Sequence, residues 1–176
     1  MTLPKIRFDG VGGDMADEAK LYGELAALKS KIQELSDKEA IRDLLARYGF
    51  CFDLGRYEAF YGLWTDDAVF RTDGPDGEIE MKGRERLKEV FGMEQSRYTA
   101  SQHLQLEYVI KIDGDNAEAI GFQLITIHTE ERPVIDRTGI RRFKFRRVGG
   151  EWRISEAVSR IMKNRSGCLD LVPEDW

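Results

Sequence analysis

The spacing of the apolar residues changes once along this chain of 176 residues, at about residue 99. Before this point apolar side chains recur every three or four positions, as they do on one face of a helix. After it they alternate with polar ones, as in a strand with one buried face. The clearest case is the set Leu104, Leu106, Tyr108, Ile110 and Ile112. Helices followed by consecutive strands indicate the α+β class.

The helical part divides into two predicted helices. The first covers residues 19–35, where leucines and Ile32 form a seam that packs on its own domain or on a neighbouring subunit. Residues 36–39, Ser-Asp-Lys-Glu, resemble a capping box, so we expect a new helix to begin there. That helix carries an apolar stripe and ends near Gly55. Residues 1–18 have no periodicity and predict a flexible arm.

The remaining elements follow from turn signals and periodicity. Residues 56–64 and 83–93 predict two more helices, and residues 73–77 a loop. Strands are expected at residues 68–70, 103–112, 117–129, 139–148 and 152–162. Residues 36–163 then form one domain, and residues 164–176 a docked tail. We expect a cone-shaped α+β barrel, with helices packed in the concave face of a curved, mostly antiparallel sheet.

Asp53 and His103 are the first candidates for chemistry. Asp53 lies about 80° from the centre of its helix's apolar stripe, at the edge of the buried face. A carboxylate near a helix C-terminus gains nothing from the helix dipole, so capping explains it poorly. His103, one of two histidines, lies on a predicted strand. An acid that orients an imidazole can remove a proton without a cofactor. The alternative is a surface aspartate and an ordinary surface histidine.

Composition excludes several function classes. The net charge of −5 argues against nucleic acid as the main partner. The basic residues between Arg141 and Arg147 alternate with Phe143 and Phe145, which we interpret as one solvated strand face. No apolar run reaches membrane-spanning length and the start lacks a signal-like segment, so we expect a cytoplasmic protein without membrane contact. Cys51 and Cys168 predict no disulfide, and neither they nor His103 and His128 have metal-site spacing.

Five segments in the right order resemble the SnoaL-like branch of the nuclear transport factor 2-like superfamily. They are SDKEAIRDLLARY at 36–48, FDLGRY at 52–57, WTDDAVF at 64–70, IDGDNA at 112–117 and GEWRI at 150–154. The resemblance is strongest to its cofactor-free lyases: scytalone dehydratase, hexachlorocyclohexane dehydrochlorinase and bile acid dehydratase. It implies an Asp–His pair at Asp53 and His103, with Tyr48 as a third catalytic residue. A late-strand arginine corresponds weakly to Arg160.

The resemblance implies a lyase without cofactor or metal, acting on a hydroxylated aromatic or polycyclic compound. Loss of water and release of formaldehyde by carbon–carbon cleavage both fit. Substrate contacts are expected from Arg160, Phe52, Tyr57, Trp64 and Phe122, although core packing is the commoner role of such aromatics. The alternative class is a non-catalytic binding or accessory-subunit module, as in ring-hydroxylating dioxygenases. The resemblance also implies a homo-oligomer, with a trimer favoured over a dimer.

Overall fold

The computed structural model describes residues 15–74, 76–95, 100–164 and 166–173. The chain divides into two compact units, Met1–Ser36 and Asp37–Trp176. Its helices are α1 (Met15–Asp53), α2 (Tyr57–Gly62) and α3 (Arg84–Gln95), with a short 3₁₀ helix η1 (Ser166–Leu171). Its strands are β1 (Trp64–Gly74), β2 (Gly77–Lys82), β3 (Ser101–Asp113), β4 (Asn116–His128), β5 (Pro133–Val148) and β6 (Glu151–Ile161).

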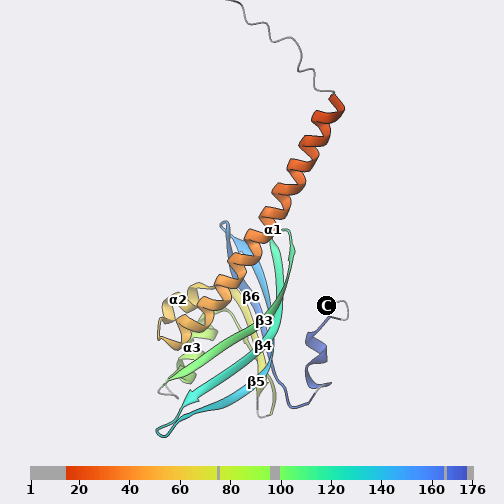
Figure 1. The fold of residues 1–176 in the computed structure, drawn as a ribbon. Coiled ribbons are helices and arrows are strands. Elements are labelled where there is room, and N and C mark those ends of the chain that lie inside the picture. The colour runs from red at the N-terminus through yellow and green to blue at the C-terminus, as the bar shows by residue number, and fades with distance from the viewer. Residues whose placement is uncertain (1–14, 75, 96–99, 165, 174–176) are drawn as a thin grey trace, which may run out of the picture. The chain divides into compact units, whose positions relative to one another are not determined.

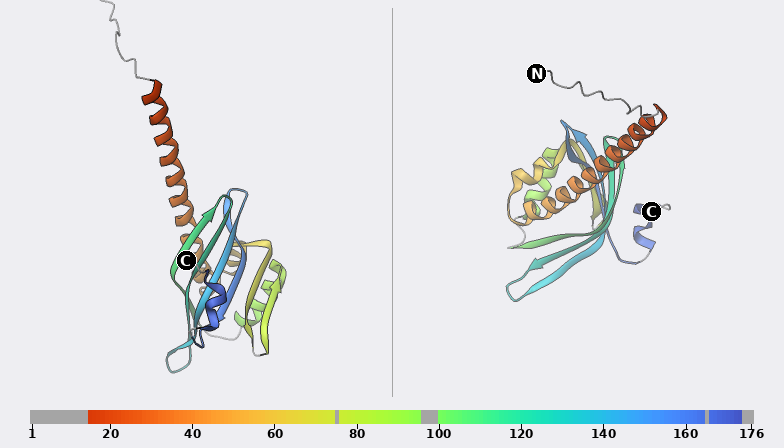
Figure 2. Two further views of the ribbon diagram at one scale, coloured as in Figure 1. Left: turned by 90° about the vertical axis from the view of Figure 1, so that its right-hand side faces the viewer. Right: turned by 45° about the horizontal axis from the view of Figure 1, so that its top comes forward.

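The six strands form one curved sheet in the order β2-β1-β6-β5-β4-β3 (Figure 1). Within the described residues only the pairing of β1 with β6 is parallel, and α3 and four strands separate these two strands in the chain. Helices α2 and α3 and residues 37–53 of α1 lie on the concave face (Figures 1 and 2). This arrangement confirms the expected α+β fold. The sheet stays open, since β2 and β3 form its two edges.

The expected start of a new helix at Ser36 is wrong, because α1 runs without interruption from Met15 to Asp53. Asp37 does not cap a helix. Its carboxylate is buried and accepts hydrogen bonds from Arg147 Nη2 at 2.8 Å and Trp152 Nε1 at 3.1 Å. These contacts hold α1 against β5 and β6, so a tertiary role replaces the local one that the sequence suggested.

Within the Met1–Ser36 unit, the described part is helical and its apolar seam is exposed. The exposed residues are Leu21, Leu25, Leu28, Ile32 and Leu35. Most of the expected flexible arm, residues 1–14, lies outside the described residues, and the rest of it belongs to α1. An exposed apolar seam with helical spacing is typical of a surface that packs on another helix or subunit.

One core cluster joins the helices to the concave face of the sheet. It contains α1 residues such as Ile41, Leu45 and Phe52 and the α3 residues Leu87 and Phe91. Every strand also contributes buried side chains to it, and β2 contributes Met81. A second, smaller cluster on the other side of the sheet consists of Ile120, Val158 and Leu171, packed against Ile140. Leu171 therefore docks η1, whereas the expected contact of Trp176 lies outside the described residues.

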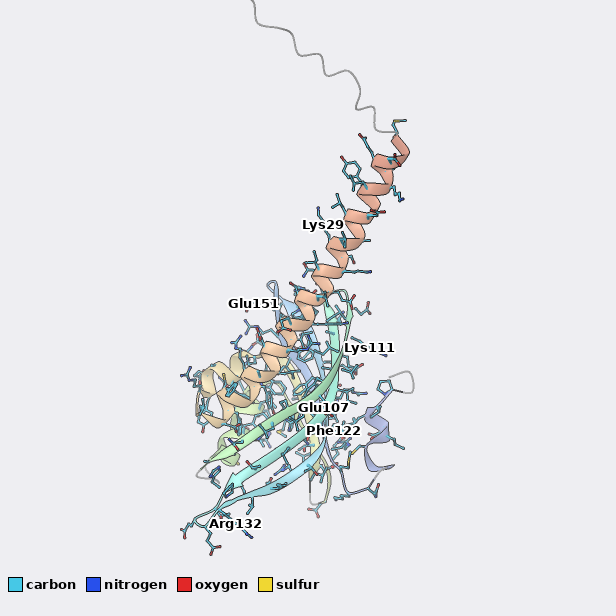
Figure 3. The ribbon with its side chains drawn as sticks, viewed as in Figure 1. Lys29, Glu107, Lys111, Phe122, Arg132 and Glu151 are labelled. Carbon is cyan, nitrogen blue, oxygen red and sulfur yellow. The ribbon has the colours of Figure 1, made fainter. Side chains whose placement is uncertain are left out.

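The predicted single apolar face of β3 is wrong, because a β-bulge divides the strand. Pairing with β4 shifts between Leu106 and Val109. Between them lies Glu107, labelled in Figure 3, whose φ is positive at 53°. Leu104 and Leu106 consequently point away from the core, whereas Ile110 is buried. An extra residue in one strand reverses the faces of everything beyond it. His103 thereby shares the concave face with Ile110.

Other strand bounds also differ from expectation. The segment 77–82 was not predicted as a strand, yet β2 pairs with β1 from Val69 to Gly74 in a hairpin. Strand β5 begins at Pro133, six residues before its predicted start. These extensions lengthen the sheet around the helices, and residues of both lie on the wall of the cavity described below.

Gly49 allows α1 to approach β3 closely. A Cβ atom at this position would lie 2.6 Å from the backbone oxygen of His103. Real Cβ atoms do not come this close to backbone, so any side chain at position 49 must displace the strand. A glycine inside a helix otherwise weakens it, which makes this contact the physical reason for its presence.

We predict that Gly49→Ala lowers the free energy of unfolding by about 1–3 kcal/mol, because β3 must move. Gly23→Ala is the matched control, since Gly23 is also inside α1 but has no neighbouring atom within 4 Å. Helix propensity alone favours alanine at both positions by roughly 1 kcal/mol. Urea denaturation of both variants measures the difference, and equal effects of the two substitutions would contradict the close approach.

A charged network ties the edge hairpin to the centre of the sheet. Arg71 on β1 contacts Glu80 on β2 at 2.7 Å and Glu156 on β6 at 2.9 Å, and Lys144 on β5 lies 3.2 Å from Glu156. Burial by itself raises the pKa of the Glu156 carboxyl, but hydrogen bonds from Arg71 and Lys144 outweigh it and hold the pKa below its ordinary value. The ionised form of Glu156 therefore stabilises the fold.

A lowered pKa means that this stabilisation is complete above the ordinary value of 4.5 and is lost as the pH falls through the folded-state value. Glu156→Gln should thus reduce the free energy of unfolding by about 1 kcal/mol near neutral pH, and by much less at about pH 3. Glu89→Gln, which breaks an exposed pair with Arg86, is the control and should change little. A penalty for Glu156→Gln that is independent of pH would count against the network.

Candidate functional site

Asp53 and His103 lie in direct contact. Asp53 Oδ1 is 2.6 Å from the imidazole Nδ1 of His103, and Oδ2 accepts a hydrogen bond of 2.6 Å from the backbone N–H of the same residue. Ser101 Oγ donates a third hydrogen bond, of 3.0 Å, to Oδ1. The carboxylate of Asp53 therefore fixes both the backbone and the ring of His103.

Local structure explains how these groups meet. Asp53 is the last residue of α1, and Gly55, with a φ of 70°, allows the chain to leave the helix. Ser101 and His103 are two residues apart on β3, so both side chains point to the same face. The side chains of His103 and Asp53 are only 11% and 14% exposed. An ionised carboxylate only accepts hydrogen bonds, so this contact places the proton of a neutral imidazole on Nδ1 and leaves Nε2 unprotonated.

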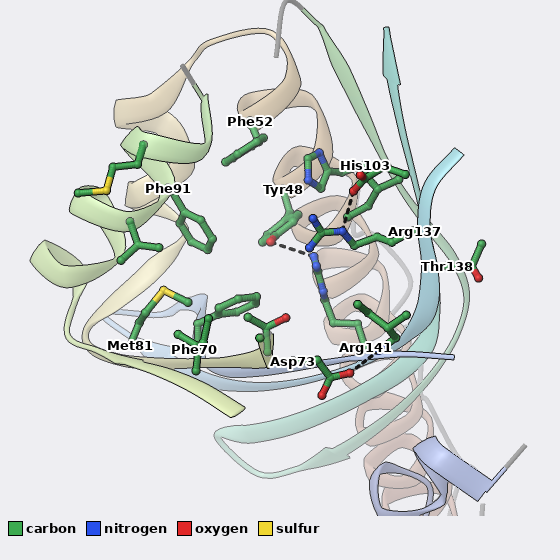
Figure 4. A pocket seen from close by; sticks show the side chains of 18 of the residues that line it. Tyr48, Phe52, Phe70, Asp73, Met81, Phe91, His103, Arg137, Thr138 and Arg141 are labelled. Atoms are coloured by element: carbon green, nitrogen blue, oxygen red, sulfur yellow. Dashed lines mark hydrogen bonds and ion pairs between the residues drawn. The ribbon is translucent and has the colours of Figure 1, made fainter. Parts of the chain in front are cut away.

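The imidazole lies on the wall of a cavity of about 880 Å³ on the concave side of the sheet (Figure 4). The apolar lining residues are Phe52, Phe70, Ile79, Met81, Val90, Phe91, Met93, Ile125, Ile135 and Ile161. The polar lining residues are Tyr48, Thr72, Asp73, His103, Asp136, Arg137, Thr138, Arg141 and Lys163. A mostly apolar wall with a few polar groups is typical of a small-molecule site.

Asp53 does not line this cavity. It lines a separate, smaller one of about 460 Å³ together with His128 and outer residues of β3. His103 lines both cavities, so its ring lies between the carboxylate and the main cavity. The ring of Phe52 packs edge-on against the imidazole, with 4.7 Å between centroids. This packing restricts the imidazole to one orientation.

Tyr48 is the second polar group that α1 brings to the cavity. It is buried, and its ring packs edge-to-face on Phe60 and Phe143 with centroid distances of 5.0 Å and 5.5 Å. Its hydroxyl oxygen accepts a hydrogen bond of 2.9 Å from Arg141 Nη1 (Figure 4). A phenol next to a guanidinium is a better proton donor than an isolated one, because the cation stabilises the phenolate.

Arg141 is a site residue that the sequence interpretation missed. Only 4% of it is exposed, so the expected solvated strand face is wrong for this position. Arg141 has the same parity on β5 as Phe143 and Phe145, which are both buried. The alternation along β5 therefore indicates that Arg141 is buried. The high local density of basic residues favoured the opposite interpretation, because basic residues usually lie on a solvated face.

Only some of the expected substrate-binding residues line the main cavity. Phe52 lines the main cavity. Tyr57 and Trp64 do not line it: Tyr57 packs against the ring of Phe52, and Trp64 is fully buried in the core. Phe122 lies on the other face of β4, where it is 46% exposed and pairs with Leu106.

Arg160 also fails to line the cavity. Its guanidinium contacts Glu78 and lies 3.7 Å from Asp73 Oδ1 and 3.8 Å from Asp170. The next residue, Ile161, does line the cavity. One position along a strand reverses the face, so the weakly matched arginine belongs to the opposite side of β6.

Tyr108 is a further phenol near the site. Burial raises the pKa of Tyr108 above its ordinary value, although the charge of Arg141 acts in the opposite direction. Its hydroxyl donates a hydrogen bond of 2.6 Å to Gln105 Oε1. Tyr108 is therefore a neutral hydrogen-bond donor, and its ring packs on that of Phe143 with 5.9 Å between centroids.

The described part of the chain contains no group of three or more His, Cys, Asp or Glu side chains placed to hold a metal ion. Both cysteines are buried and unbridged. Among the residues described, no helix has the length and apolar character needed to cross a membrane.

Three solved structures illustrate the similarity of the fold. A nuclear transport factor 2-like protein with a cystatin-like fold from Novosphingobium aromaticivorans shares 24% identity, with 85% of this chain and 97% of that chain covered and a TM-score of 0.76. A protein of unknown function from Mycobacterium tuberculosis also shares 24%, over 81% and 80% of the two chains, with a TM-score of 0.68. The β subunit assigned to an aromatic-ring-hydroxylating dioxygenase from Novosphingobium aromaticivorans shares 20%, over 75% and 93%, with a TM-score of 0.64.

Identities this low establish the fold and not the activity. Comparison with curated proteins gives no match. The family model of the SnoaL-like domain matches residues 33–158, which cover most of the chain and include Tyr48, Asp53, His103 and Arg141. The protein therefore belongs to the SnoaL-like family, in the nuclear transport factor 2-like superfamily.

Proposed function

We propose that the protein is a cofactor-independent lyase that uses Asp53 and His103 for general acid–base elimination on a hydrophobic, hydroxylated aromatic or polycyclic compound. The observation that carries the proposal is the contact of 2.6 Å between Asp53 Oδ1 and His103 Nδ1, with the imidazole on the wall of a mostly apolar cavity. An oriented base on the wall of a mostly apolar cavity is what proton abstraction from a small molecule requires.

His103 acts as the general base in this proposal. Asp53 holds the proton on Nδ1, so that Nε2 is the basic atom, and it stabilises the imidazolium after proton transfer. Burial of both side chains strengthens this stabilisation, because the effective dielectric constant is lower than in water. Asp53 is thus a positioning residue that acts through His103.

Tyr48 serves as the proton donor on the leaving-group side. Its hydroxyl, polarised by Arg141 at 2.9 Å, can donate to an oxygen on which negative charge develops. In a dehydration, His103 takes a proton from carbon and the C–H electron pair forms the double bond. The adjacent carbon–oxygen bond breaks, and the hydroxide leaves as water with a proton supplied by Tyr48.

Carbon–carbon cleavage is the close second reaction. Here His103 takes the proton of a hydroxymethyl group, the bond between that group and the adjacent carbon breaks, and formaldehyde leaves. The electron pair remains on the adjacent carbon, which then takes back the proton from the imidazolium. Both reactions need the same oriented base, and the size of the cavity, about 880 Å³, suits a substrate of two or more rings in either case.

A screen without added cofactor or metal tests the proposal. The panel contains hydroxylated aromatics, diaryl propanoids and steroid-like alcohols, and mass spectrometry detects loss of water or of formaldehyde. We expect His103→Ala to lower kcat by roughly 10²–10⁴-fold, the contribution of a general base, with folding intact. His128→Ala is the matched control, because His128 is the other histidine and is exposed.

The alternative class is a non-catalytic binding or accessory-subunit module, favoured by the fold similarity to a dioxygenase β subunit. Absence of turnover across the panel, with wild-type and His103→Ala proteins equally folded, would contradict the lyase. Co-purification of a second protein at fixed stoichiometry would then support the accessory subunit. Turnover that His103→Ala leaves unchanged would exclude the proposed base and not the enzyme.

We also propose that the protein forms a homo-oligomer, with a trimer favoured over a dimer. Leu104, Leu106 and Phe122 form an exposed apolar patch on the outer face of β3 and β4. Light scattering coupled to gel filtration should give a mass of about three chains, and Leu106→Glu should lower it. Val148→Glu, at an exposed apolar residue near a turn, should not. A monomeric wild-type protein would contradict the proposal.

A further inference from the structure

Arg141 is a buried cation without a carboxylate partner among the described residues. It is 4% exposed, and the one hydrogen bond of its side chain in the described part of the chain goes to Tyr48. Its Nε is buried and has no hydrogen-bond partner there. Two less buried arginines of this unit both have carboxylate partners: Arg147 contacts Asp37 and Asp115, and Arg160 contacts Glu78. Arg141 is thus the exception that needs an explanation.

The acids on the cavity wall are already engaged by other groups. Asp136 Oδ2 pairs with Arg137 Nε at 2.7 Å. Asp73 Oδ2 accepts a hydrogen bond of 2.8 Å from the backbone N–H of Ile161, and its Oδ1 lies 3.7 Å from Arg160. Among the described residues, no carboxylate therefore pairs with Arg141 on the cavity wall.

Aromatic rings supply part of the compensation. The guanidinium carbon of Arg141 lies 5.3 Å from the ring centroid of Tyr48, 5.6 Å from that of Phe70 and 5.9 Å from that of Phe143. Each ring attracts the cation through its quadrupole. The rings carry no net negative charge, so a bound anion would supply the ionic partner that this buried guanidinium lacks among the described residues.

We propose that Arg141 forms a carboxylate-binding subsite, so that the substrate of the proposed lyase is an aromatic or polycyclic acid. This inference rests on the proposed function and adds the substrate class. A guanidinium matches the planar geometry of a carboxylate and carries a single charge. A monoanion neutralises that charge, whereas a dianion such as a phosphate monoester would leave excess negative charge in a mostly apolar cavity. The rings of Phe70 and Phe91 line the same cavity and would contact the apolar part of the ligand (Figure 4).

The test compares a carboxylate with its neutral isostere. Isothermal titration calorimetry measures the affinities of naphthalene-2-carboxylate and naphthalene-2-carboxamide for the His103→Ala protein, which excludes turnover. We expect the carboxylate to bind at least about 10-fold more tightly, as for a buried charge-assisted contact. Arg141→Met should abolish this preference, and Lys163→Met should retain it, because Lys163 also lines the cavity but is exposed.

Equal affinity for the two probes would overturn the subsite, and so would a preference that survives in Arg141→Met. If Arg141→Met does not fold, Arg141→Gln and the thermal shift of the wild-type protein with each probe replace it. Stabilisation by the carboxylate alone supports the subsite, and equal shifts contradict it. A failure of the proposed lyase function is distinguishable from this, because the protein would then bind the carboxylate selectively but convert no substrate. Turnover of neutral substrates without carboxylate selection overturns the subsite alone.

Discussion

The carboxylate of Asp53 is the contact on which the site depends. It joins the end of α1 to the edge strand β3 through the backbone N–H and the imidazole of His103 and through Ser101. An edge strand has unpaired backbone groups on one side, and this bond satisfies one of them. The same bond sets the position of the imidazole. Structural anchoring and orientation of a base are therefore performed by one side chain, and loss of it should affect both.

Two backbone features make that contact possible. Gly49 removes the side chain that would separate α1 from the backbone of His103. The bulge at Glu107 changes which side chains of β3 point inward. As a result, His103 points to the cavity at one end of the strand and Ile110 points to the core at the other. On the wall of the same cavity, Arg141 and Tyr48 provide a positive, hydrogen-bonding region. The mostly apolar cavity thus has both a basic nitrogen and a cationic donor region on its wall, the groups that proton removal and stabilisation of negative charge require.

The α+β class and the pairing of Asp53 with His103 were predictable from sequence, because periodicity and the resemblance both act over many residues. Other features were not, and three of them have clear physical causes. The capping signal at Ser36 is local, and the tertiary bonds of Asp37 to Arg147 and Trp152 override it. The bulge uses a non-glycine residue with positive φ, Glu107, which carries no turn signal. Arg141 was assigned by its charge, although its parity with Phe143 already indicated burial.

Nitrogen-15 NMR of protein labelled at histidine tests the central claim most directly, at a pH where both imidazoles are neutral. The bond to Asp53 requires the proton of His103 on Nδ1, whereas exposed His128 should show the Nε2-protonated form that dominates in free histidine. We expect the Nδ1 proton of His103 to disappear in Asp53→Ala, with His128 unchanged as an internal reference. A His103 that is protonated on Nε2 in the wild-type protein, like His128, would contradict the account, because its basic nitrogen would then face the carboxylate and not the cavity.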